Sequence, residues 1–274
     1  MKKGVNKLNG KVINFIKNFS YTLSSNLISL IISTLVVLIV PKLVGVEEYG
    51  YWQLYLFYVS YVGFLHFGWN DGIYLRYGGE EYVKLDKRLF FSQFYMLVIT
   101  QIIIAGIIFF ATQTFIGDAN RVFILQTTAI CLLLTNVRHM LLFILQATNR
   151  IKEYAQVTMI GRVLYFSIII LFLLMGIREY KLMIVADLIG RFISLLLAMN
   201  FCKDIVFRKM SSFYFSFQEM FENIIVGIKL MFANIASMLI IGVVRFGIER
   251  SWDVETFGKV SLTLSASNLM MLFI

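Results

Sequence analysis

Long runs of apolar residues, separated by short polar stretches, dominate the chain. A helix that crosses a bilayer needs about 20 mostly apolar residues, and eight stretches reach or approach that length. Because lipid offers backbone amides no water, we predict helices rather than open strands, and the stretches are too long for barrel strands of about 9–11 residues. The predicted fold class is therefore an all-α integral membrane protein, a polytopic helical bundle. The eight stretches cover residues 19–44, 51–77, 89–116, 122–147, 154–177, 182–201, 224–246 and 257–274.

Composition supports the membrane class and excludes most soluble chemistry. Hydrophobic residues make up 59% and charged residues 15% of the 274 positions, whereas soluble domains average about 45–50% and about 25%. Cys131 and Cys202 have no neighbours at metal-ligand spacing, and His66 and His139 lie alone in apolar runs. No phosphate loop, nucleophile elbow or dinucleotide fingerprint is present. We expect no enzyme, no cofactor and no metal.

The distribution of basic residues predicts the orientation. The formal net charge is +9, which in a membrane protein indicates basic cytoplasmic loops rather than a nucleic-acid partner. With the N-terminus inside, 14 basic residues fall on the cytoplasmic side and 6 on the outside, so we predict a cytoplasmic N-terminus. The inner set is Lys2, Lys3, Lys7, Lys11, Lys17, Arg76, Lys84, Lys87, Arg88, Arg150, Lys152, Lys203, Arg208 and Lys209. The outer set is Lys42, Arg121, Arg178, Lys181, Arg250 and Lys259.

An internal repeat predicts how the chain divides. Shifting the sequence by 208 residues aligns Asn26 with Asn234 and the turn Val46-Glu47-x-Tyr49-Gly50 with Val254-Glu255-x-Phe257-Gly258. Helices one and seven would then be equivalent, as in a parallel repeat about an axis normal to the membrane. We predict a six-helix lobe over 1–202, an interfacial linker over 203–223 and two helices of a second lobe over 224–274. The aromatic-rich linker favours an interfacial helix over a flexible loop.

Ionisable residues inside predicted spans are the candidate functional residues, because each costs about 2.5–3.5 kcal/mol on insertion scales. Asp187 and Arg191 are four residues apart and could neutralise each other. Asp71 could accept a proton or sodium ion, or pair with an arginine. Lys229 lies near a helix end and could reach the headgroups. The full set, mostly cationic as an anion-binding cavity requires, is Asp71, Arg138, His139, Arg162, Asp187, Arg191, Lys229 and Arg245.

Several segments resemble one transporter family. The stretch 41–54, PKLVGVEEYGYWQL, is similar to the first outer loop of Wzx-type oligosaccharide flippases, which belong to the multidrug, oligosaccharidyl-lipid and polysaccharide exporter superfamily. The segments at 68–76, 146–155 and 227–231 and the motif at 255–259 follow in the family's order and spacing. The resemblance covers nearly the whole chain.

The resemblance implies a fold and a substrate. The fold would be two six-helix lobes around a central cavity, like that of the multidrug extruders, in a bacterial plasma membrane. The substrate would be a polyprenyl pyrophosphate that carries a sugar repeat unit for O-antigen, capsule or exopolysaccharide assembly. Polysaccharide polymerases and glycosyltransferases would be partners, beside membrane lipids. The chain holds only two helices of the second lobe, so we expect a fragment or truncated product.

Site residues follow from this resemblance as a class rather than as a fixed motif. The basic cavity residues would be Arg138, Arg162, Arg191 and Arg245, while Asp71 and Asp187 are candidates for ion coupling. Two alternatives stay open: an ion-coupled small-molecule (multidrug) antiporter, and a non-transporting scaffold in a polysaccharide assembly complex.

Overall fold

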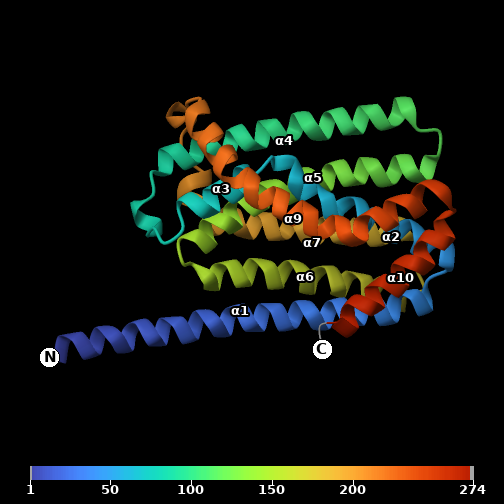
Figure 1. The fold of residues 1–274 in the computed structure, drawn as a ribbon, viewed down its shortest axis with the longest axis horizontal. Coiled ribbons are helices and arrows are strands. Elements are labelled where there is room, and N and C mark those ends of the chain that lie inside the picture. The colour runs from blue at the N-terminus through green and yellow to red at the C-terminus, as the bar shows by residue number, and fades with distance from the viewer. Residues whose placement is uncertain (1, 272–274) are drawn as a thin grey trace.

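The computed structural model describes residues 2–271 and consists, over that range, of helices and connecting turns without a strand (Figure 1). The polytopic all-helical fold predicted from the sequence is therefore confirmed. The α-helices are α1 (Lys2–Leu43), α2 (Val46–Tyr61), α3 (Trp69–Arg76), α4 (Lys87–Phe115), α5 (Ala119–Ala147), α6 (Ile151–Leu174), α7 (Tyr180–Phe201), α8 (Lys203–Val206), α9 (Phe217–Ser251) and α10 (Val254–Met271). Three short 3-10 helices are η1 (Val62–His66), η2 (Tyr82–Lys84) and η3 (Met210–Ser212).

Among the described residues, six helices are long and apolar enough to cross a membrane: Val12–Leu43 within α1, and α4, α5, α6, α7 and α9. The protein is thus a multi-pass membrane protein by helix length and composition. The other two predicted stretches also form helices but do not meet both criteria. The stretch at 51–77 is broken in the middle, and α10 carries serines, threonines and an asparagine among its apolar residues. Residues 272–274 of the last stretch lie outside the described part.

The break in the second stretch has a local cause. Phe67 and Gly68 both adopt left-handed backbone conformations, with φ of 55° and 82°, which ends η1 and redirects the chain into α3. A broken helix leaves carbonyl groups without intrahelical donors, and in a membrane each must find another one. Asn136 donates to the carbonyl of Val62 at 3.0 Å, and Gln101 donates to that of Leu65 at 3.1 Å. His66, Asn70 and Asp71, polar residues of this predicted span, lie close to the break.

The single interfacial helix expected over 203–223 is wrong. The linker contains only the four-residue α8 and the three-residue η3, and α9 already begins at Phe217. Side chains from α4 bind the linker directly: Arg88 donates to the Ser212 carbonyl and Ser92 accepts from the Tyr214 amide, at 3.1 and 3.2 Å. These bonds to the linker backbone take the place of a regular helix.

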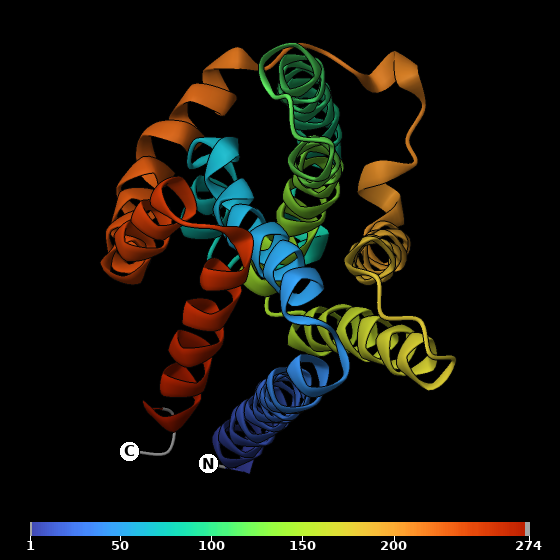
Figure 2. The same cartoon turned by 90° about the vertical axis from the view of Figure 1, so that its right-hand side faces the viewer.

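The loops gather at two ends of the bundle, in the alternation that the predicted topology requires. At one end Lys87 and Tyr82 both contact Asp204, the former at 3.6 Å and the latter at 2.5 Å. At the other end the Tyr180 hydroxyl donates to Asn120 at 2.8 Å, and the Tyr180 amide donates to Glu48 of α2 at 2.7 Å. Figure 2, viewed roughly along the helices, places α2 centrally, with α9 and α10 on one side of it and α6 and α7 on the other.

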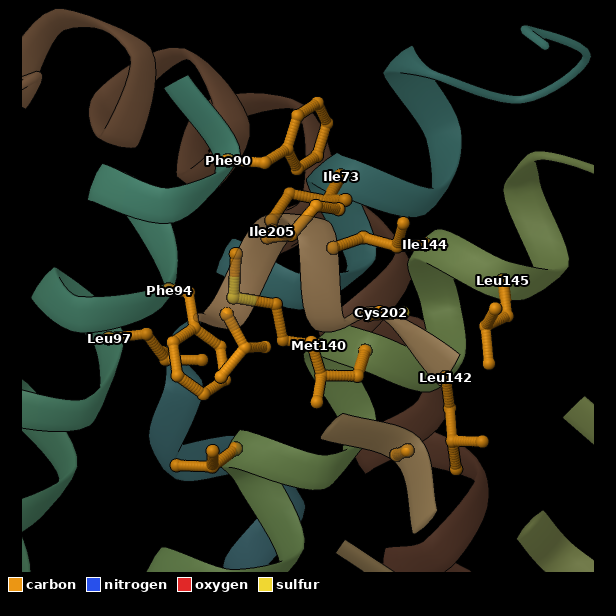
Figure 3. Close-up of a cluster of buried hydrophobic side chains, with 14 of the residues drawn as sticks. Ile73, Phe90, Phe94, Leu97, Met140, Leu142, Ile144, Leu145, Cys202 and Ile205 are labelled. Atoms are coloured by element: carbon orange, nitrogen blue, oxygen red, sulfur yellow. The ribbon is translucent and has the colours of Figure 1, made fainter. Parts of the chain in front are cut away.

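The core consists of two clusters of buried apolar side chains. The cluster in Figure 3 joins α3, α4 and α5 to the start of the linker, through residues such as Phe94, Met140 and Ile205. The second joins α1, α2, α5, α7 and α10 around Trp52 and Tyr55. Because lipid tails are as apolar as these side chains, close van der Waals packing rather than removal from water holds such clusters together. Cys131 and Cys202 are free thiols buried in these two clusters.

Glycines allow α3 and α9 to cross at backbone contact. A Cβ atom added at Gly72 would overlap the Asn223 backbone, and one added at Gly227 would overlap the backbone of Gly68 and Gly72. Small residues at such crossings are the usual means of close helix approach in membranes. The long helix α9 is therefore fixed against the broken second stretch of the bundle.

Candidate functional site

A cavity of about 420 Å³ is lined by residues of α1, α2, α5, α6, α7, α9 and α10. Two glycines in its lining allow α6 and α7 to pack closely: a Cβ added at Gly190 of α7 would lie 2.9 Å from the Gly161 carbonyl oxygen of α6. The cavity is lined by Ile32, Ser33, Val36, Val37, Trp52, Gln53, Leu56, Arg138, Gly161, Arg162, Tyr165, Asp187, Gly190, Arg191, Arg245 and Ser265.

All four arginines that the sequence singled out line this one cavity, although they come from four different helices. With Asp187 as the acidic lining residue, the formal charge of the wall is four positive minus one negative, or +3. Charges at this depth are tolerated only if they face a polar cavity or each other. The wall is therefore suited to a multivalent anion.

Arg191 is neutralised locally. Its Nε donates to Asp187 Oδ2 at 2.7 Å, and its Nη1 donates to the Thr135 hydroxyl at 2.9 Å. Tyr55 donates to the same Asp187 oxygen at 2.7 Å. The i,i+4 pair that the sequence left open thus exists, and it is held by a third side chain from α2.

Arg138 lacks a carboxylate partner. Its Nη1 donates to the Ser194 hydroxyl at 3.1 Å, and its Nε is buried without an acceptor. Ser194 in turn donates to the Val157 carbonyl at 2.9 Å, which ties α7 to α6. A guanidinium group offers five N–H donors, so most of the donors of Arg138 remain for a ligand.

Arg162 and Arg245 complete the cationic wall. Arg162 makes no ion pair within the described residues and is exposed to the cavity. Arg245 donates to Gln53 Oε1 at 3.2 Å and stacks between Phe57 and Phe257, at 5.3 and 5.4 Å from their ring centres. Such cation–π contacts hold a guanidinium in place without neutralising it.

The two acids proposed for ion coupling lie in different surroundings. Asp187 lines the cavity and is paired with Arg191. Asp71 does not line it; it is buried at the start of α3, where its Oδ2 lies 3.7 Å from His66 Nε2. Over residues 2–271, no group of three or more His, Cys, Asp or Glu side chains is placed to hold a metal ion.

Sequence reasoning missed the neutral residues that hold the charges. Tyr55, Thr135 and Ser194 position Asp187, Arg191 and Arg138, yet hydroxyl residues inside apolar runs are common and gave no signal. Gln53 likewise lies inside a predicted span and gave no signal. It is the residue that holds Arg245.

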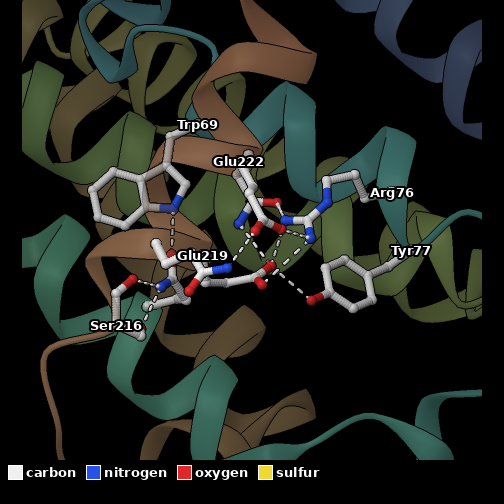
Figure 4. Close-up of polar contacts among 9 residues, drawn as sticks. Trp69, Arg76, Tyr77, Ser216, Glu219 and Glu222 are labelled. Carbon is white, nitrogen blue, oxygen red and sulfur yellow. Dashed lines mark hydrogen bonds and ion pairs between the residues drawn. The ribbon is translucent and has the colours of Figure 1, made fainter.

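A second polar cluster joins α3 to the start of α9 (Figure 4). Arg76 pairs with Glu219 at 2.5 Å and with Glu222 at 2.7 Å, and the Tyr77 hydroxyl donates to Glu219 at 2.8 Å. Arg76, one of the basic residues assigned to the cytoplasmic side, is thus paired with protein carboxylates. Nearby, Gln93 accepts from the Trp69 indole and donates to Ser216.

Comparison with known proteins identifies no family for this chain. No protein-family model, no curated protein and no solved structure matches the chain.

Proposed function

We propose that the protein belongs to the polysaccharide-exporter superfamily and moves polyprenyl-pyrophosphate-linked oligosaccharides across the membrane. The observation that carries this proposal is the cavity wall with a formal charge of +3, made by Arg138, Arg162, Arg191 and Arg245 against Asp187. Pyrophosphate is a compact multivalent anion, and guanidinium groups bind phosphate oxygens through paired N–H donors. The resemblance of the segments at 41–54, 68–76 and 146–155 supports the same substrate class.

The proposed mechanism divides the substrate among three environments. The pyrophosphate binds the cavity arginines, the sugars occupy aqueous space, and the polyprenyl tail stays in lipid. Binding must be moderate, because the same charges have to release the substrate on the far side. Stacking on neutral aromatic rings positions the Arg245 guanidinium without a carboxylate that competes with the substrate. The Asp187 carboxylate beside Arg191 moderates the attraction.

A binding experiment tests this proposal. The purified protein in lipid nanodiscs is titrated with a fluorescent short-chain polyprenyl pyrophosphate, with and without inorganic pyrophosphate as competitor. Arg162→Ala and Arg245→Ala should each weaken binding by about tenfold or more, as expected for loss of a charge-assisted hydrogen bond. Arg178→Ala, which removes a basic residue from a loop outside the cavity, is the matched control.

The same titration separates the alternative functions. Binding of a lipophilic organic cation in place of the pyrophosphate would favour the multidrug antiporter. An unchanged affinity of Arg162→Ala and Arg245→Ala for the pyrophosphate probe would contradict the cationic-cavity mechanism.

A further inference from the structure

A second large opening lies at the end of the bundle from which α1 projects. Figure 1 shows the N-terminal part of α1 extending past the turn between α5 and α6. The helix has 42 residues, or about 63 Å at a rise of about 1.5 Å per residue, whereas the hydrocarbon core of a bilayer is about 30 Å thick. The groove between α1 and this turn has a volume of about 490 Å³, which is the size of a small-molecule site. It lies at the end that the charge distribution assigns to the cytoplasm.

The lining of this groove is polar but uncharged. Asn14, Asn18 and Thr22 come from successive turns of α1, and Asn149 comes from the turn between α5 and α6. Within the described part of the chain, no acidic or basic residue lines the groove. The groove therefore differs from the arginine cavity, because it offers hydrogen bonds without attracting an ion.

An amide pair joins α1 to the turn. Asn18 Nδ2 donates to Asn149 Oδ1 at 2.8 Å. Asn149 has a left-handed backbone conformation, with φ of 59°, which asparagine tolerates better than most residues. The Arg150 amide closes the turn by donating to the Leu145 carbonyl at 2.8 Å. A side-chain amide has two N–H donors and an oxygen with two lone pairs, so this one bond leaves both asparagines with donors and acceptors for a ligand.

Two exposed phenylalanines line the same groove. Phe15 is 71% and Phe19 is 56% exposed, and their stacked rings have centroids 6.5 Å apart. Aromatic rings beside neutral hydrogen-bonding groups fit a ligand that combines apolar C–H surface with many hydroxyl groups. A sugar ring has both features. A phosphate group would require cations, and a lipid tail has no hydroxyl groups to pair with the amides.

The polar face of α1 continues from the groove to the arginine cavity. Polar residues recur at intervals of three or four, within an arc of about 100° around the helix axis, so they share one face. The first three line the groove, and Ser33 lines the arginine cavity. Ser25, between them, is only 3% exposed and therefore faces the bundle rather than lipid. The positions are Asn14, Asn18, Thr22, Ser25, Ser29 and Ser33.

We propose that this groove is a carbohydrate-binding site, at which the sugar part of the lipid-linked substrate docks from the cytoplasm before its pyrophosphate enters the arginine cavity. The proposal rests on the proposed transport function, which supplies the substrate, and adds a second site of different chemistry. The groove binds neutral hydroxyl groups and the cavity binds phosphate oxygens. The polar face of α1 joins the two sites and offers hydroxyl partners along the way.

Two lipids separate sugar binding from phosphate binding. Lipid-linked oligosaccharides extracted from the cells that produce the protein, and the same polyprenyl pyrophosphate without sugars, each compete with the fluorescent probe for the purified protein in nanodiscs. The glycosylated lipid should bind about tenfold more tightly than the sugar-free one. Asn18→Ala and Phe15→Ala should each weaken binding of the glycosylated lipid by about three- to tenfold, as for loss of neutral contacts, and leave the sugar-free lipid unchanged. Phe15→Trp should retain the sugar preference, because it keeps an aromatic face.

The matched control is Asn26→Ala, which removes an amide from the same helix outside the groove and should change neither affinity. Equal affinity of the wild type for the two lipids overturns the carbohydrate site. So does an Asn18→Ala variant that weakens both lipids equally or neither. If Asn18→Ala weakens only the glycosylated lipid while Arg162→Ala leaves both affinities unchanged, the groove stands and the cationic-cavity mechanism fails. The reverse result leaves the cavity in place and removes the groove.

Discussion

Gly50 and Gly258 meet at the crossing of α2 and α10, where a Cβ added to Gly258 would lie 2.9 Å from the Gly50 Cα atom. The surrounding contacts are reciprocal: Gly50 abuts the Val254 carbonyl oxygen, and Gly258 abuts that of Val46. Both pairs of partners are related by the 208-residue shift found in the sequence. Two equivalent segments that contact each other across a two-fold axis make reciprocal contacts of this kind.

The first prediction concerns that crossing. Gly258→Val should lower the stability of the folded protein by about 1–3 kcal/mol, because the added side chain forces α2 and α10 apart. Gly106→Ala in α4 is the control, since no atom lies within 4 Å of the added Cβ, and a helical Gly→Ala change is neutral or stabilising. Thermal unfolding in one detergent measures both variants. Equal melting temperatures for Gly258→Val and wild type would contradict the tight crossing.

The repeat itself makes a second prediction. In a structure determined in lipid nanodiscs, α1 and α2 should superpose on α9 and α10, with Asn26 on Asn234 and Gly50 on Gly258. The measurement is the residue register of the best superposition. A register that differs by several residues, or an opposite membrane orientation of the two pairs, would refute the two-lobe division at 1–202, 203–223 and 224–274.

The ion pairs between α3 and α9 give a third prediction. A double-mutant cycle on Arg76 and Glu219, each changed to alanine, should yield a coupling energy of about 1–3 kcal/mol, because both side chains are largely shielded from water, at 25% and 17% exposure. Lys84 and Glu81 are the control pair, with 64% and 65% exposure. Their coupling should stay below about 1 kcal/mol. Similar coupling energies for the two pairs would show that the α3–α9 ion pairs contribute no more than a surface contact.

The fourth prediction concerns orientation. A cysteine introduced at Lys84 should be protected from an impermeant thiol reagent on intact cells, and one at Gly117 should react, because the basic loops stay in the cytoplasm. Both native cysteines, Cys131 and Cys202, are buried, so the unmodified protein provides a low background. Labelling at position 84 but not at 117 would reverse the assignment.

The fifth prediction tests the chemistry of Arg162. Arg162→Lys should retain part of the affinity for the pyrophosphate probe that Arg162→Ala loses, because an ammonium group still attracts phosphate but lacks the two-pronged donor. If Arg162 served only in helix packing, both variants would lower protein yield and leave the affinity per folded molecule unchanged. Fluorescence titration normalised to folded protein distinguishes these results.

The sequence alone determined the helical membrane class, the approximate limits of the long spans and the set of buried charges. These depend on local properties: an apolar run of sufficient length has to be a helix in lipid, and an arginine such as Arg138 within it has to avoid lipid. The break at Phe67 and Gly68 was not predicted: the pattern at 51–77 indicates one span. The linker was mispredicted because hydrogen bonds from Arg88 and Ser92, on a distant helix, replace those of a local helix.

Only the tertiary structure decided which charges meet and which are neutralised. Four arginines from α5, α6, α7 and α9 share one cavity wall. Gly161 and Gly190 bring two of those helices, α6 and α7, to backbone contact. Asp187 pairs with Arg191 and also accepts a hydrogen bond from Tyr55 of α2, whereas Asp71 faces His66 at the turn that starts α3. Spacing along one helix identifies partners on that helix alone. Partners on other helices are set by how the helices pack.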